Sequence, residues 1–141
     1  MKNLKFIKSM FRFPKKLLIS FWDLRLSSII SIRESGKKIF KIYDYGQITR
    51  MRGKTFEKKE PETIKWIKSF KEDELLIDIG ANIGIYSLYA GIKNINVVSI
   101  EPDALNYALL NLNIRLNNLC SKITPYCIAI HDKNKYAKFN I

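Results

Sequence analysis

The sequence has few of the residues that build metal centres and disulfide frameworks. It contains two cysteines and one histidine in 141 residues. Cys120 and Cys127 lie seven residues apart, which matches no metal-ligand spacing such as C-x-x-C. We therefore expect no metal site, and we expect two reduced thiols, buried in or beside a strand, in a cytosolic protein.

Long uninterrupted apolar runs are also missing. The longest early run, at 17–32, is interrupted by Asp23 and Arg25, and a bilayer-spanning helix needs about 20 apolar residues. No small-residue cleavage site follows a clean apolar core, so we expect no secretory signal. We therefore predict a cytoplasmic protein. The basic N-terminus suggests the alternative that the protein lies peripherally at the inner face of the membrane.

Acidic residues are scarce relative to basic ones. The chain has 25 Lys and Arg against 13 Asp and Glu, a net charge of +12. Residues 1–41 hold eleven of the basic residues and two of the acidic ones, so this segment has a charge of +9 and the remaining hundred residues have +3. Such asymmetry suggests a membrane surface or an anionic partner for the N-terminus, with residues 1–35 as the contact. A helical lid packed on the domain, with solvated lysines, explains the same pattern.

Apolar spacing in the first half of the chain predicts mostly helices. Helices are expected over 3–13 and 15–30, and a hairpin with Gly46 in its middle over 38–51. A further helix is expected over 60–70, because Pro61 suits a first helical position and acidic residues precede the lysines.

From residue 75 onward, strand patterns alternate with helix patterns. The stretch LLIDI (75–79) is continuously apolar, as in a strand buried on both faces of a parallel sheet. This alternation predicts an α/β protein with a parallel sheet. One helix should bury a stripe of Leu105, Leu109, Leu112 and Leu116. The expected strands are 75–79, 96–101, 123–130 and the start of a fourth at 136–141, and the expected helices are 83–92 and 103–117.

A short polar motif follows the first of these strands. Asp78, Gly80, Asn82 and Gly84 form D-x-G-x-N-x-G where a strand turns into a helix. Ligands of open α/β sheets bind beyond the carboxyl ends of strands, and free N–H groups at a helix start favour an anionic group. Glu101 ends the next strand, 21 residues after Gly80. An acid at that position can accept both hydrogen bonds of a ribose diol.

The spacing of the glycines separates the candidate cofactors. A dinucleotide fingerprint G-x-G-x-x-G read from Gly80 requires glycines at the positions of Asn82 and Ile85. The G-K-[ST] of a P-loop is absent. The motif instead resembles the first motif of class I S-adenosylmethionine-dependent methyltransferases, and an NAD-binding protein is the weakest alternative.

Four segments together resemble the FkbM family of methyltransferases. They read EPETIKWI (60–67), DIGANIGIYSLYA (78–90), SIEPDALNYALLNLNI (99–114) and AIHDK (129–133). The resemblance implies S-adenosyl-L-methionine as cofactor and O-methylation of a hydroxyl on a sugar or a secondary metabolite, hence a small-molecule or glycan acceptor. No catalytic base is assigned.

The resemblance also implies roles for individual residues. Asp78, Gly80, Asn82 and Gly84 are expected around the methionine part of the cofactor and Glu101 on its ribose. Asp132, after the third strand, matches more loosely an acidic position near the adenine. His131, the single histidine, is more simply a solvated turn residue than a catalytic one.

The expected fold is a Rossmann-like class I methyltransferase fold, truncated after about the third or fourth core strand. We divide the chain into a basic helical segment (1–37), a hairpin and helix (38–70) and the first half of the cofactor-binding domain (71–141). The strand at 75–79 would then have an open apolar edge, a feature prone to aggregation unless a partner chain completes the sheet. We expect the chain alone to bind cofactor weakly and to transfer no methyl group.

Two other functions fit parts of the sequence. A non-catalytic remnant or adaptor on a membrane surface would explain the basic N-terminus. A nucleic-acid methyltransferase would explain the net charge, but the charge lies outside the cofactor region and no [DN]-P-P-[FYW] motif occurs. We therefore expect no nucleic-acid partner.

Overall fold

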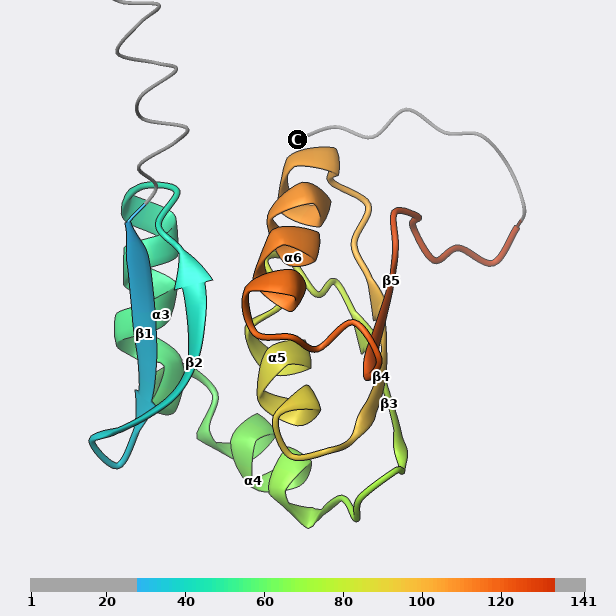
Figure 1. The fold of residues 1–141 in the computed structure, drawn as a ribbon. Helices are drawn as coiled ribbons and strands as arrows, with labels where there is room; N and C mark the ends of the chain where they lie inside the picture. The colour runs from blue at the N-terminus through green and yellow to red at the C-terminus, as the bar shows by residue number, and fades with distance from the viewer. Residues whose placement is uncertain (1–27, 134–141) are drawn as a thin grey trace, which may run out of the picture.

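The computed structural model describes residues 28–133. The predicted helix at 3–13, most of that at 15–30 and the predicted fourth strand lie outside this range. Three layers are visible in Figure 1: a two-stranded hairpin with a helix against it, a middle layer of helices, and a parallel sheet. The elements follow the order β1 (Ile29–Glu34), β2 (Lys37–Tyr43), α3 (Gln47–Lys59), α4 (Pro61–Ser69), β3 (Leu75–Ile79), α5 (Ile85–Gly91), β4 (Asn96–Ile100), α6 (Ala104–Leu116) and β5 (Ile123–Tyr126).

The hairpin lies earlier in the chain than the sequence predicts. Its strands β1 and β2 pair antiparallel, and Ser35 and Gly36 form the turn with φ of 49° and 79°. Two residues with positive φ make the tight turn that matches strand twist. Gly46 instead precedes α3, and Ile29 and Ile30 belong to β1, so the predicted hairpin centre and the predicted helix end at residue 30 are both wrong.

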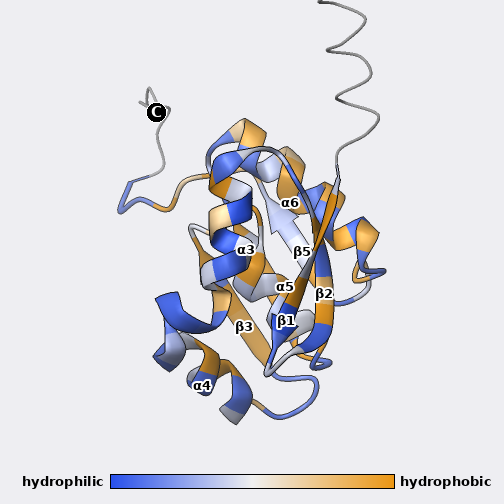
Figure 2. Ribbon diagram, turned by 90° about the vertical axis from the view of Figure 1, so that its left-hand side faces the viewer, coloured by the Kyte–Doolittle hydropathy of each residue, from blue (hydrophilic) through white to orange (hydrophobic). Residues whose placement is uncertain are grey.

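The parallel sheet has the strand order β3-β4-β5 and is covered on one face by helices. Along β3, Leu76 is buried, whereas Leu75, Ile77 and Ile79 are each more than half exposed. In the described part of the chain, one face of this strand is therefore exposed, and the prediction that both faces are buried is wrong. Figure 2 shows β3 as a largely apolar strand at the surface of the molecule.

The helices after residue 60 begin and end close to their predicted limits, but α6 is rotated relative to the prediction. Leu105 is 66% exposed and Leu112 is 46% exposed, while Leu110, Asn113 and Ile114 are buried. A hydropathy pattern treats every asparagine as a surface residue. It therefore cannot predict that Asn113, whose amide is hydrogen-bonded, belongs to the core. Both cysteines are free and exposed, which corrects their predicted burial.

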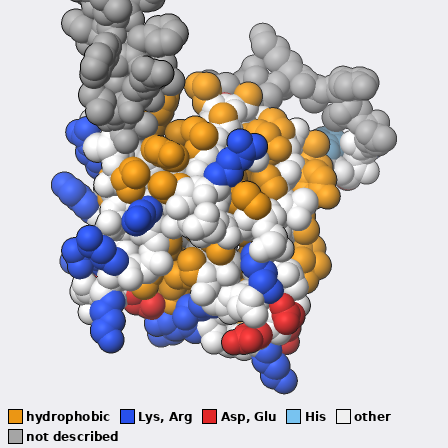
Figure 3. Space-filling view, in the orientation of Figure 1, with side chains coloured by type: hydrophobic (Ala, Val, Ile, Leu, Met, Phe, Trp, Pro, Cys, Tyr) orange, Lys and Arg blue, Asp and Glu red, His pale blue; other side chains and the backbone are white. Residues whose placement is uncertain are grey.

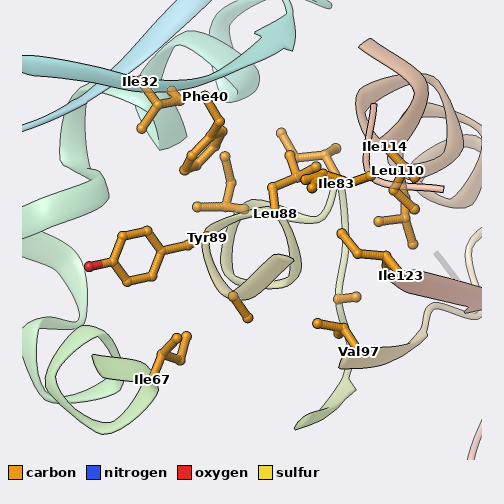
Figure 4. Close-up of a cluster of buried hydrophobic side chains, with 14 of the residues drawn as sticks. Ile32, Phe40, Ile67, Ile83, Leu88, Tyr89, Val97, Leu110, Ile114 and Ile123 are labelled. Carbon is orange, nitrogen blue, oxygen red and sulfur yellow. The ribbon is translucent and has the colours of Figure 1, made fainter. Parts of the chain in front are cut away.

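The core is a single apolar cluster that joins all three layers. Leu88 and Tyr89 of α5 lie at its centre, between Phe40 of the hairpin and Val97 of the parallel sheet (Figure 4). The Tyr89 hydroxyl donates to Glu34 Oε1 at 2.7 Å. Lys68 Nζ lies 2.6 Å from the same oxygen. Within the described range, no helix is both long enough and apolar enough to cross a bilayer.

Side-chain amides of α6 cover the free edge of β2. Asn117 accepts a hydrogen bond from the Lys41 N–H at 2.8 Å and donates to the Lys41 carbonyl at 2.7 Å. One turn earlier, Asn113 accepts from the Tyr43 N–H and donates to the Ile83 carbonyl, both at 2.9 Å. Residues two apart along a strand direct their backbone groups to the same edge, so the two amides replace a neighbouring strand. Asn113 thereby connects the hairpin to the loop before α5.

We expect Asn113→Leu to destabilise the fold. It leaves the Tyr43 N–H and the Ile83 carbonyl without partners, and each unsatisfied buried group costs about 1–3 kcal/mol, so the free energy of unfolding should fall by roughly 2–4 kcal/mol in urea titrations. Asn111→Leu is the matched control, because Asn111 donates only to Tyr107 within the same helix, and its effect should stay within about 0.5 kcal/mol. Equal losses in both variants would contradict the role given to Asn113.

Candidate cofactor site

The predicted D-x-G-x-N-x-G motif forms the connection between β3 and α5. Gly80, Asn82 and Gly84 have φ of 78°, 52° and 89°, so every second residue of the loop is left-handed. Glycine and asparagine are the residues that adopt this conformation at low cost. The Gly80 and Ala81 N–H groups both donate to the Ile100 carbonyl, at 2.8 and 3.0 Å. The loop therefore lies against the carboxyl end of β4.

The glycine at position 84 serves close packing as well as the turn. A Cβ atom there would overlap Leu110 Cδ1, so any side chain at this position would require the buried Leu110 to move. The neighbouring residue belongs to α6. At Gly80, by contrast, an added Cβ would meet no atom within 4 Å. The absence of a side chain at Gly80 thus leaves open space above the loop.

Glu101 lies beside this loop, as the sequence predicts. Its side chain is 5% exposed and accepts the Asn82 N–H on Oε2 at 2.7 Å and the Asp103 N–H on Oε1 at 2.8 Å. A carboxylate has about four lone-pair positions, so each oxygen keeps one acceptor position. Glu101 thus fixes the loop to the end of β4 and can still accept two hydrogen bonds from a ligand.

Asp78 lies at the end of β3, next to Ser99 of β4. The Ser87 hydroxyl donates to Asp78 Oδ2 at 2.5 Å, and the Ser87 and Ser99 hydroxyl oxygens lie 2.7 Å apart. Burial raises the pKa of Asp78, as do the charges of Glu101 and Glu60, although the Ser87 hydrogen bond opposes this. The N-cap residue of α5 is Gly84, and Asp78 contacts the first turn of this helix through Ser87.

A cavity of about 430 Å³ opens beside Asp78, Gly80 and Asn82. Its other wall comes from α3, which contributes Arg52, from Glu60 between α3 and α4, and from α4. Arg52 belongs to no sequence motif, and Glu60 begins the segment EPETIKWI, for which no cofactor role is predicted. Their position depends on how the hairpin places α3. Pro61 at the start of α4 was the available signal that the chain turns at this point.

The cavity contains both signs of charge. Arg52 Nε is buried and has no hydrogen-bond partner among the described residues. Glu60 forms an ion pair of 3.8 Å with Lys59. Burial and the neighbouring Glu60 raise the pKa of the Tyr86 phenol to about 12. Within residues 28–133, no cluster of three or more His, Cys, Asp or Glu side chains is arranged to hold a metal ion.

The structure does not bring Asp132 to this cavity. Its side chain is 74% exposed and pairs with His131 in a surface turn, at 2.5 Å. Of the six predicted cofactor-binding residues, Asp78, Gly80 and Asn82 line the cavity. Glu101 and Gly84 support its rim, through Asn82 and through the start of α5 respectively.

Comparisons with known proteins agree with this geometry. No family model and no curated protein sequence matches the chain, so the FkbM family is not shown. Among solved structures, the putative transferase PH0793 from Pyrococcus horikoshii is similar, with 26% identity and a TM-score of 0.50 over 73% of this chain and 37% of that one. P. horikoshii TYW2 in complex with MeSAdo is similar to the same extent, with 25% identity, a TM-score of 0.50 and the same coverages.

A tRNA m1G37 methyltransferase from M. jannaschii matches 70% of this chain and 29% of its own length, with 22% identity and a TM-score of 0.49. This chain spans 37% of the length of the two P. horikoshii proteins. Its described part is an α/β unit with a three-stranded parallel sheet that matches part of class I methyltransferase domains, and it resembles S-adenosylmethionine-dependent methyltransferases.

Proposed function

We propose that this chain is the cofactor-binding part of an S-adenosylmethionine-dependent methyltransferase. The observation that supports this best is the position of the β3–α5 loop between the carboxylates of Asp78 and Glu101. Its left-handed residues hold the chain close to the end of β4, and two carboxylates flank it at the ends of adjacent strands. In parallel α/β sheets, this is the edge where nucleotide-type ligands bind.

The chemistry of the side chains fits the parts of this cofactor. Glu101 keeps two acceptor positions, the number that a ribose diol needs. The charge of Glu60 raises the pKa of Asp78, and the ammonium of a methionine group supplies a positive charge that favours the Asp78 carboxylate. Arg52 offers an unpaired donor for the carboxylate of the same group. The cavity thus complements the zwitterion, and Glu101 at its rim complements the diol.

When bound, S-adenosylmethionine supplies a methyl group that is activated by its sulfonium sulfur. The residues named above bind and orient, and alignment of two reactants alone accelerates a transfer strongly. The acceptor we propose is a hydroxyl of a sugar or a secondary metabolite. This part of the proposal rests on the FkbM-like segments around Glu60, Asp78 and Glu101.

The open face of the parallel sheet supports a further part of the proposal. Leu75, Ile77 and Ile79 present apolar side chains to solvent on the face opposite the helices. Exposed apolar surface of this kind marks an interaction site. We infer that additional polypeptide, in the same protein or from a partner chain, covers this face in the active enzyme.

Glu101→Gln should weaken cofactor binding. Glutamine keeps one acceptor oxygen, so one of the two backbone N–H groups loses its partner and the ribose loses an acceptor. Hydrogen bonds to charged groups contribute about 1.5–3 kcal/mol, so calorimetry at millimolar ligand should show about tenfold or weaker binding of both S-adenosylhomocysteine and 5′-methylthioadenosine. Glu74→Gln, at the opposite end of β3, is the control. An unchanged affinity in Glu101→Gln would refute the ribose role.

Asp78→Asn should weaken binding of S-adenosylhomocysteine about tenfold and leave 5′-methylthioadenosine, which lacks the amino-acid group, nearly unchanged. This difference between the two ligands separates an ammonium contact from general damage to the site. Equal losses for both ligands would exclude the ammonium contact.

The same substitution should stabilise the ligand-free protein at neutral pH. Because the pKa of Asp78 is raised in the folded state, the stabilisation from its protonated form is complete below the unfolded pKa and is lost as pH rises through the folded pKa. Asp78→Asn should therefore melt above the parent at pH 7, and the difference should disappear toward pH 4. Asp73→Asn, which removes an exposed partner of Lys122, should not raise the melting temperature. A pH-independent gain for Asp78→Asn would contradict the assignment.

A further inference from the structure

Positive charge in the described part of the chain is concentrated in the hairpin and α3. Residues 28–60 contain nine Lys and Arg against four acidic residues, whereas residues 61–133 contain seven against eight. In the view of Figure 3, Lys and Arg side chains crowd the side of the molecule that carries the hairpin. The charge asymmetry of the sequence therefore extends into a folded surface and is not confined to the undescribed N-terminus.

The outer face of the hairpin, opposite α3, holds three of these basic residues, Arg33, Lys38 and Lys41. Arg33 pairs across the strands with Lys38, and Ser31 pairs with Lys41. A register shift next to Ile32 places Lys38 and Ile39 on the same face. Arg33, Lys38 and Lys41 are exposed, and none has a carboxylate within 4.0 Å among the described residues.

This arrangement is unfavourable in the isolated protein. Like charges directly opposite each other in a hairpin destabilise it, and no acidic side chain of residues 28–133 compensates Arg33 and Lys38. An external anion that contacts both side chains would remove the repulsion. The surface thus has charge complementarity to a ligand with several negative charges.

The face is also grooved. A cavity of about 320 Å³ lies between β2 and the end of α6, with Ser31, Lys38, Lys41, Ile39, Leu116 and Asn117 around it. The Asn117 amide is already bonded to the Lys41 backbone, so it fixes the groove wall. The Ser31 hydroxyl and two ammonium groups remain to donate to a ligand.

The shape of this groove favours a narrow polyanion over a membrane. A bilayer binds through apolar side chains that protrude into it, but Ile39 and Leu116 are only partly exposed within the groove. We propose that the outer face of the hairpin binds the sugar–phosphate backbone of a single-stranded nucleic acid, with Arg33, Lys38 and Lys41 at its phosphates. This departs from the expectation of no nucleic-acid partner, which rested on the charge lying outside the cofactor region.

The proposal is independent of the cofactor site, because none of these residues lines the cavity beside Asp78. Three phosphate contacts predict that log K falls with log salt concentration with a slope of about −2 for a single strand. Removing two contacts should reduce affinity about tenfold at 150 mM salt and make the slope shallower by about 1.4.

The test measures fluorescence anisotropy of labelled 15-nucleotide oligo-U and oligo-dT with the full chain, between 50 and 200 mM salt. Lys38→Glu/Lys41→Glu should bind about tenfold more weakly. Lys71→Glu/Lys133→Glu changes the net charge equally away from the groove and should stay within about twofold. A preference for one oligonucleotide identifies RNA or DNA as the source of the phosphates. Lys38→Gln/Lys41→Gln provides a milder variant if the charge reversal fails to fold, as judged by circular dichroism.

Three results would overturn the proposal. The first is an equal loss of oligonucleotide affinity in the groove and control variants. This result would mean that binding depends on net charge or on the N-terminal segment. The second is no binding of either oligonucleotide by the parent chain at 100 µM. The third is a loss of binding to phosphatidylserine vesicles in the groove variant with unchanged oligonucleotide binding, which would make this face a membrane surface.

Discussion

The contacts of the Glu101 carboxylate with two backbone N–H groups hold the candidate site in shape. One N–H belongs to Asn82 in the loop after β3, and the other belongs to Asp103 at the start of α6. A nearly buried carboxylate is stable only with such partners, since an unpaired buried charge costs several kcal/mol. The loop thereby stays over the end of the neighbouring strand, and its N–H groups and left-handed turns keep a fixed direction. The electrostatics of Asp78 and the open space above Gly80 depend on this placement.

The helix layer connects the loop after β3 to the hairpin. Asn113 connects the carbonyl of Ile83, next to the motif, with the edge of β2. Because β2 and α3 are thereby placed over the loop, Arg52 and Glu60 reach the same cavity as Asp78. The hairpin is thus a structural part of the site, although it lies far from the motif in sequence. Its outer face remains free for a separate role in binding.

The sequence predicts those features that local backbone geometry dictates. Gly80, Asn82 and Gly84 were predictable because left-handed residues after a strand leave a strong compositional signal. The position of Glu101 followed from strand spacing, but its two N–H partners did not, since they depend on the register between β3 and β4. The cavity wall of Arg52 and Glu60 was also out of reach, because tertiary packing alone brings α3 to the loop.

The errors have equally specific causes. The predicted leucine stripe of α6 is wrong for Leu105 and Leu112, which are exposed, whereas Leu109 packs against the core. A hydropathy pattern counts the buried Asn113 as polar and therefore misses the side of the helix that is buried. The hairpin was placed around Gly46 because a Ser35–Gly36 turn has a weaker signal than a lone glycine between apolar runs. LLIDI has the composition of a strand buried on both faces, yet one of its faces is open in residues 28–133. The composition of a strand shows that both of its faces are apolar enough to be buried. It does not show whether another element covers each face.

The most direct test of the account is a titration of the ¹⁵N-labelled chain with S-adenosylhomocysteine, followed by two-dimensional NMR. The account predicts that the largest amide shifts fall on residues 78–86 and 101–103, with smaller shifts at Arg52 and Glu60. Shifts confined to the hairpin or to the surface turn around Asp132, or no shifts at millimolar ligand, would contradict it.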